Sequence, residues 1–193
     1  LEELEAICTN NDIGVIVIEG ARYDFPTKEF LEGITRISKQ HNIVVVVDEI
    51  TSGWRLTDGG VHKLYNFKPD IAVYGKALGN GYAISAVVGK KEVMDTAQDT
   101  FISSTFWTER VGFVAALATL NKLTSNKVWE HLSTIGQYVG NEWEKLANKH
   151  QLNITVTDFK PLITFKFQYD SLNAALSTLY IQEMLKEGYI AAN

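Results

Sequence analysis

Residues 14–48 read GVIVIEGARYDFPTKEFLEGITRISKQHNIVVVVD, and this stretch decides the fold class. Its two continuous β-branched runs, residues 15–18 and 43–47, are typical of strands that are covered on both faces. Between them, residues 27–40 place apolar side chains every three or four positions, which predicts an amphipathic helix. A strand, a crossover helix and a second strand predict a parallel pair, and therefore an α/β fold.

The remaining chain continues this sheet and then changes character. Residues 71–74 and 83–88 have strand composition and flank a glycine-rich loop. Residues 154–157 and 162–167 alternate apolar and polar side chains, as in short strands with one solvated face. Helical spacing recurs in four segments, of which the second is apolar enough to be a buried helix: residues 1–8, 111–123, 125–150 and 173–186.

This change of character predicts two domains. Residues 1–123 are expected to form part of a large α/β domain with a mostly parallel sheet. Residues 124–193 are expected to contribute a long connecting helix and the beginning of a smaller α+β domain.

Composition excludes several classes of protein. The 193 residues are 46% hydrophobic and 21% charged, with a net charge of −5, which argues against a nucleic-acid or anionic-membrane surface. A single cysteine and four scattered histidines predict neither a disulfide scaffold nor a metal site. The longest apolar run is far too short to span a bilayer. We therefore expect a cytoplasmic protein, and the missing start methionine indicates a piece of a longer one.

Two charged residues stand directly after predicted strands, where open α/β sheets hold ligands. Asp48 follows a buried strand, so its carboxylate either receives a ligand cation or caps the next turn. Lys76 lies among glycine, alanine and leucine, which would keep water away and favour the neutral, nucleophilic amine. The alternative is a lysine whose amine extends to solvent.

Three hydroxyl residues, Ser103, Ser104 and Thr105, precede a predicted helix. Backbone N–H groups and the helix dipole favour a phosphate at such a place, whereas the commoner alternative is an N-cap. The glycine loop matches neither the P-loop nor the dinucleotide pattern. Taken together, the three features require a ligand with a carbonyl for the amine, a basic ring nitrogen for the carboxylate and a phosphate for the hydroxyls. Pyridoxal phosphate has all three.

Two segments also resemble a known family. Residues 47–55, VDEITSGWR, are similar to the D-E-V-x-T-G-F-R signature of the class III (ornithine/GABA-type) aminotransferases. Residues 69–82, PDIAVYGKALGNGY, are similar to the lysine segment of that family. The separation of Asp48 and Lys76, 28 positions, is also that of the glutamate-1-semialdehyde aminomutase branch.

The resemblance implies a three-layer, fold-type I transferase that binds pyridoxal phosphate, here in its middle-to-late part. It implies that Lys76 forms the Schiff base and that Asp48 pairs with the ring nitrogen. Ile50 would pack against the ring, and Thr105 would reach the phosphate of the neighbouring subunit in a homodimer. The partners implied are a small-molecule amino donor and a keto or aldehyde acceptor.

The chain departs from the family pattern at two places. Gly20 stands where the family has proline after the first strand, and in residues 104–110, STFWTER, the last three residues replace the G-N-P of the family pattern S-T-x-x-G-N-P. Trp107, Glu109 and Arg110 either line a substrate entrance or simply begin a helix. The activity expected is amino-group transfer through Lys76. The alternatives are an isomerase like glutamate-1-semialdehyde 2,1-aminomutase, and a catalytically silent subunit with the same fold.

Overall fold

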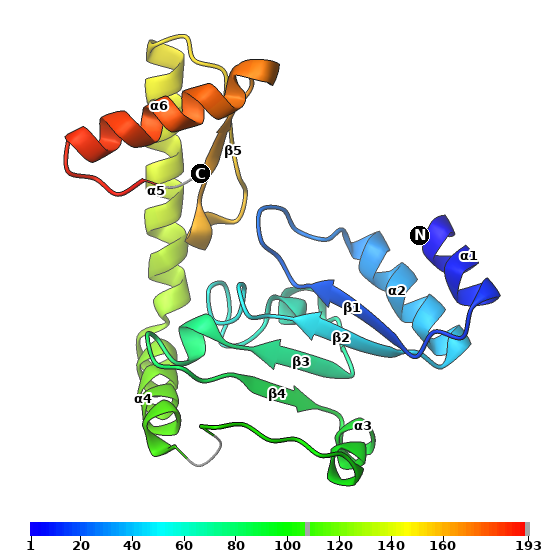
Figure 1. Cartoon of the computed structure of the whole chain (residues 1–193). Helices are drawn as coiled ribbons and strands as arrows, with labels where there is room; N and C mark the ends of the chain where they lie inside the picture. The colour runs from blue at the N-terminus through cyan, green and yellow to red at the C-terminus, as the bar shows by residue number, and fades with distance from the viewer. Residues whose placement is uncertain (107–108, 192–193) are drawn as a thin grey trace.

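The computed structural model describes residues 1–106 and 109–191, and it contains a four-stranded sheet (Figure 1). The strands lie in the order β1-β2-β3-β4, with β1, β2 and β3 parallel and β4 antiparallel to β3. Their bounds are Val15–Glu19, Val44–Asp48, Ile71–Tyr74 and Ala86–Gly89. The mostly parallel α/β sheet expected from the sequence is therefore confirmed.

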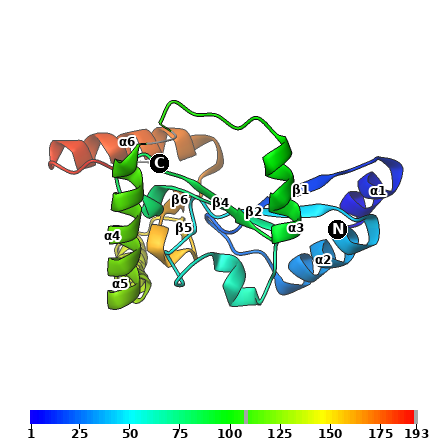
Figure 2. The same cartoon turned by 90° about the horizontal axis from the view of Figure 1, so that it is seen from below.

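Two N-terminal helices pack against one face of this sheet (Figures 1 and 2). They are α1, Glu2–Asn10, and α2, Lys28–His41. Helix α2 begins where the Thr27 hydroxyl accepts a hydrogen bond from the Phe30 N–H, and it ends at Asn42 in the left-handed conformation. Its buried isoleucines meet alternate side chains of β1 and β2 and so form the main core.

Helix α4, Arg110–Asn126, corrects one expectation, because it is not buried in the described part of the chain. Val111, Val114 and Leu117 are 50%, 65% and 64% exposed. Only its small residues Gly112 and Ala116 are buried. An apolar run predicts the helix correctly, but it does not reveal which of its faces finds a partner.

A long helix, α5 (Val128–Lys149), leads away from the sheet to the C-terminal unit (Figure 1). This unit consists of β5 (Ile154–Val156), β6 (Phe165–Phe167) and α6 (Asn173–Lys186). Strand β6 is shorter than expected because residues 160–162 form a 3-10 turn instead. The domain boundary expected after residue 123 falls inside α4, which ends at Asn126. The division into two domains stays a prediction. No helix among the described residues is long and apolar enough to cross a membrane.

The C-terminal unit packs against the loops that follow β1 and β2. Phe159 is fully buried there, in a cluster with Ala21 and Val61. The ring of Phe25 meets it edge-on, with 5.8 Å between ring centroids. The unit thus covers the carboxyl ends of two parallel strands, where α/β sheets place their sites.

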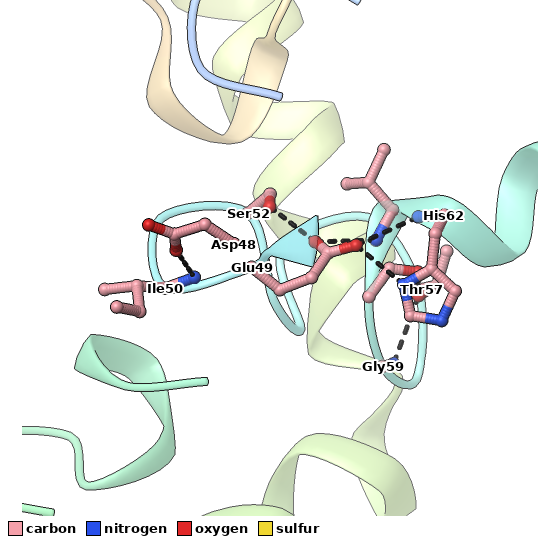
Figure 3. Close-up of polar contacts among 9 residues, drawn as sticks. Asp48, Glu49, Ile50, Ser52, Thr57, Gly59 and His62 are labelled. Atoms are coloured by element: carbon pink, nitrogen blue, oxygen red, sulfur yellow. Dashed lines mark hydrogen bonds and ion pairs between the residues drawn. The ribbon is translucent and has the colours of Figure 1, made fainter. Parts of the chain in front are cut away.

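A buried carboxylate holds the loop after β2 in place (Figure 3). Glu49 is 0% exposed, and its oxygens accept hydrogen bonds from the Ser52 hydroxyl at 2.5 Å, the Val61 N–H at 2.9 Å and the His62 N–H at 3.0 Å. The His62 ring nitrogen Nδ1 lies 2.8 Å from the same carboxylate. Both ends of the loop, residues 49–62, are therefore joined through one side chain.

The charge state of Glu49 follows from these contacts. Burial alone would raise the pKa of its carboxyl, but the hydrogen bonds from His62, Ser52 and the Val61 N–H outweigh burial and leave the pKa below its ordinary value of 4.5. Two glycines pack against the carboxylate. A Cβ at Gly20 would lie 2.8 Å from Oε2, and one at Gly60 would lie 2.5 Å from Oε1. A side chain at either position would displace the carboxylate.

The substitution Glu49→Gln should destabilise the full-length protein by about 2–4 kcal/mol at pH 7, because an amide cannot accept all of these hydrogen bonds. The folded-state pKa of Glu49 lies below 4.5, so its contribution is present above about pH 4.5 and lost as the pH falls through the folded-state value. Urea unfolding at pH 7 and pH 4 measures both effects.

The loss caused by Glu49→Gln should therefore shrink in acid. Glu144→Gln, which changes an exposed carboxylate on α5, is the control and should have little effect at either pH. A Glu49→Gln variant as stable as the wild type at pH 7 would contradict the structural role given to this carboxylate.

Candidate active site

Asp48 is the last residue of β2, and its backbone lies level with Glu19 of β1 and Val73 of β3. Its side chain is half-buried, and Oδ1 accepts a hydrogen bond from the Ile50 N–H at 2.8 Å (Figure 3). The capping alternative is thus realised by one oxygen. Oδ2 accepts no hydrogen bond from any residue that the structure describes, which leaves half of the carboxylate for a ligand.

Lys76 begins a 3-10 turn directly after β3 and Gly75. Its φ angle of 41° is left-handed, which costs a non-glycine residue about 1–2 kcal/mol. Its amine, Nζ, donates a hydrogen bond to the Thr51 hydroxyl at 2.7 Å. Positive φ also occurs at ordinary helix ends of this chain, such as Asn42, but Lys76 follows a strand end, where strained residues cluster at functional sites.

The expectation of a desolvated Lys76 is wrong for the part of the chain described, because this residue is exposed. The physical reason is that glycine and alanine neighbours carry too little side chain to cover a lysine. The amine is nevertheless not free in solvent, since its acceptor Thr51 is buried. The contact to a neutral hydroxyl, rather than to a carboxylate, directs the amine without making an ion pair.

The turn after β2 brings the lysine and the aspartate segments together. Thr51 lies three residues beyond Asp48 and holds the amine of Lys76. Ile50 lies between Asp48 and Thr51 in the sequence. Its Cγ2 would be 3.5 Å from a Cβ placed on Gly75, so its side chain packs beside the residue that precedes Lys76. The structure thus places Asp48, at the end of β2, and Ile50, in the turn that follows, beside the turn that carries Lys76 at the carboxyl end of β3.

Sequence reasoning missed Thr51. A hydrogen bond between side chains 25 positions apart leaves no periodicity or spacing in the sequence. The only signal was a hydroxyl residue two positions after an Asp-Glu pair at a strand end.

Ser103 and Ser104 lie in an exposed segment without regular secondary structure, and Thr105 lies in an exposed turn, so none of the three stands at a helix start. The Ser104 hydroxyl accepts a hydrogen bond from the Phe106 N–H at 3.4 Å, whereas α4 begins only at Arg110. The N-cap alternative is therefore wrong for these residues. The phosphate role of Thr105 stays a prediction.

The proposed entrance residues are only partly described. Trp107 lies outside the described residues. Glu109 and Arg110 are exposed, and Glu109 occupies the N-cap position of α4 without a side-chain capping bond. Their alternative reading, as residues that begin a helix, matches their position.

Comparison with solved structures confirms the fold. The chain superposes on a FumI protein from Sphingopyxis sp. MTA144, described in its PLP internal aldimine form, with a TM-score of 0.91 at 22% identity, over 98% of this chain and 47% of that one. It matches an ornithine aminotransferase from Plasmodium yoelii with a TM-score of 0.80 at 24% identity, over 94% of this chain and 50% of that one. The fold-type I architecture expected from the resemblance is confirmed.

Curated relatives are more similar in sequence. A 3-aminobutyryl-CoA aminotransferase from Cloacimonas acidaminovorans is 34% identical over 96% of this chain and 48% of its own length. A glutamate-1-semialdehyde 2,1-aminomutase from Nitrosopumilus maritimus is 32% identical over 100% of this chain and 50% of its own length. The chain spans about half the length of these relatives. The sequence model of the class-III aminotransferase family matches residues 1–189, and the chain therefore belongs to that family.

Proposed function

We propose that the complete protein is a pyridoxal-phosphate-dependent aminotransferase whose reactive amine is Lys76. The observation that supports this most directly is the 2.7 Å hydrogen bond from Nζ of Lys76 to the Thr51 hydroxyl. It brings the lysine against the turn that starts at Asp48, so that an amine and a carboxylate from neighbouring strand ends serve one site. Membership of the class-III aminotransferase family supports the same assignment.

The residues present fit the cofactor. The amine of Lys76 is held only by a neutral hydroxyl, and Oδ2 of Asp48 has no donor among the described residues. Ile50 adds an apolar surface beside Gly75. When bound, pyridoxal phosphate supplies a ring that accepts the electron pair left on the substrate carbon.

Four side chains would then have the following roles. Lys76 would provide the amine that condenses with the cofactor carbonyl as water leaves, and once a substrate amine has displaced it, its Nζ would take the proton from the substrate carbon as a general base. Asp48 holds the proton on the ring nitrogen, because a carboxylate favours a neighbouring cation. Thr51 would hold Nζ near the carboxyl ends of β2 and β3 before the cofactor binds. Ile50 excludes water from one side of the ring.

The proposed reaction uses a small-molecule amino donor and a keto or aldehyde acceptor. We also propose a homodimer in which Thr105 contributes to the phosphate site of the neighbouring subunit. Its exposure at the surface supports a role outside its own subunit.

The second candidate is an isomerase that moves an amino group within one molecule. It is supported by the 32% identity to the aminomutase of Nitrosopumilus maritimus. The same lysine and aspartate would serve both reactions, so the two candidates differ in substrate handling rather than in these side chains.

Borohydride reduction of the cofactor-loaded full-length protein should leave a pyridoxyl label on the peptide that carries Lys76. Lys76→Ala should lose the label and turnover, whereas Lys68→Ala, which changes an exposed lysine, should keep both. Peptide mass spectrometry locates the label. A label on another lysine would refute the assignment, and a label at Lys76 without turnover of any amine would favour a silent subunit.

Transaminase and mutase activities are separable with an amino donor and a separate keto acceptor. We expect ¹⁵N from the donor to appear in the acceptor product, measured by mass spectrometry, because the amino group leaves the first substrate. Isomerisation of glutamate 1-semialdehyde without any acceptor would instead identify the mutase.

Asp48→Ala should slow turnover about 10²–10³-fold while the cofactor still binds. Asp48→Asn separates the two roles of this residue, because its amide oxygen still accepts the Ile50 N–H while the negative charge is lost. We expect Asp48→Asn to be nearly as slow as Asp48→Ala, and Asp58→Asn, at an exposed position, to be unaffected. An Asp48→Asn variant with wild-type turnover would show that the charge is not needed.

A further inference from the structure

A cavity of about 550 Å³ adjoins the turn that carries Lys76. It opens between the loop after β2, the 3-10 turn at Lys76–Leu78 and the junction of α4 and α5. One side is apolar, with Leu123, Val128 and Leu132. Lys76 lines it but Asp48 and Ile50 do not, so it adjoins the surface proposed for the cofactor ring and shares one residue with it.

The polar side of this cavity is positively charged. Arg55, Lys76 and Lys122 line it, and none of its lining residues within 1–106 and 109–191 is acidic. None of these three cations makes an ion pair with a carboxylate in the part of the chain that the structure describes. Asn80 and Thr119 add neutral hydrogen-bonding groups. A cavity of this size with one charged and one apolar wall is suited to a small amphiphilic ligand.

Arg55 is the strongest indication of the charge of that ligand. It is half-buried, and its Nε donates a hydrogen bond to the Thr51 carbonyl at 2.6 Å. Burial lowers the pKa of its guanidinium, and no carboxylate offsets that burial. Its terminal N–H groups have no acceptor among residues 1–106 and 109–191. A planar fork of donors that is partly desolvated and unpaired matches a carboxylate or a phosphate.

A competing explanation for the cations Arg55 and Lys122 is that they interact with the C-terminus of α4, because the carbonyls there carry negative partial charge. Helix α4 ends at Asn126, and the carbonyls of Leu123 and Thr124 accept a hydrogen bond from the Lys127 N–H. Neither Arg55 nor Lys122 donates to these carbonyls in the described part of the chain. The helix end therefore leaves the guanidinium fork available.

We infer that this cavity binds a small organic anion, a carboxylate or a phosphate monoester, between Arg55 and Lys122. The apolar residues of α4 and α5 would contact its hydrocarbon part. This site shares Lys76 with the proposed cofactor site, but the anion would lie between Arg55 and Lys122, so the inference rests on these two side chains and not on the reaction proposed for Lys76.

The test uses the cofactor-loaded full-length protein, so that the proposed cofactor site is already filled. Butyrate, butyl phosphate and uncharged butan-1-ol are titrated at low ionic strength by calorimetry, because these probes share one hydrocarbon part. We expect at least one anion to bind, more weakly in high salt, and the alcohol not to bind. The anion that binds more tightly identifies the ligand class.

Variants locate the site. Arg55→Met should weaken binding of that anion about tenfold or more, Lys122→Met should weaken it several-fold, and Lys149→Met, at an exposed lysine on α5, should leave it unchanged. If Arg55→Met does not fold, Arg55→Lys and Lys122→Met carry the test. Absence of anion binding in the wild type, or equal binding in the Arg55 and Lys122 variants, overturns the inference.

Discussion

The buried carboxylate of Glu49 is the constraint on which the rest of the site depends. It joins the two ends of the loop after β2 through Ser52 and the N–H groups of Val61 and His62. Val61 in turn packs on Phe159, so the same carboxylate supports the contact between the sheet and the C-terminal unit. A fully hydrogen-bonded buried charge specifies one arrangement of its partners, because any other arrangement leaves it unpaired.

Polar contacts to Thr51 of that loop, rather than burial alone, hold the side chains of Lys76 and Arg55. Thr51 uses its hydroxyl to accept from Lys76 and its carbonyl to accept from Arg55. One residue thus organises both the proposed catalytic amine and the cationic wall of the neighbouring cavity. The left-handed backbone at Lys76 adds strain, which the surrounding contacts must outweigh for the turn to persist.

Periodicity predicted the frame well because strands and helices bury side chains at fixed intervals. The continuous valines of β2 and the helical spacing of α2 each indicated the correct element and the mostly parallel sheet. It could not predict which face of α4 is covered, nor that Lys76 is exposed, because both depend on contacts between distant segments. The same limit hid Thr51 and the network around Glu49, whose partners come from separate turns.

The departures from the family pattern differ in their physical meaning. Gly20 is explained by packing, since a Cβ there would lie 2.8 Å from Oε2 of Glu49. Glycine at this position therefore leaves room for the Glu49 carboxylate and so preserves the loop that follows Asp48 and contacts Lys76. Glu109 and Arg110 are exposed at the start of α4, where no packing requirement fixes their identity. A change at such positions leaves the contacts around Glu49 and the sheet unaltered, so this departure does not affect how the candidate site is held.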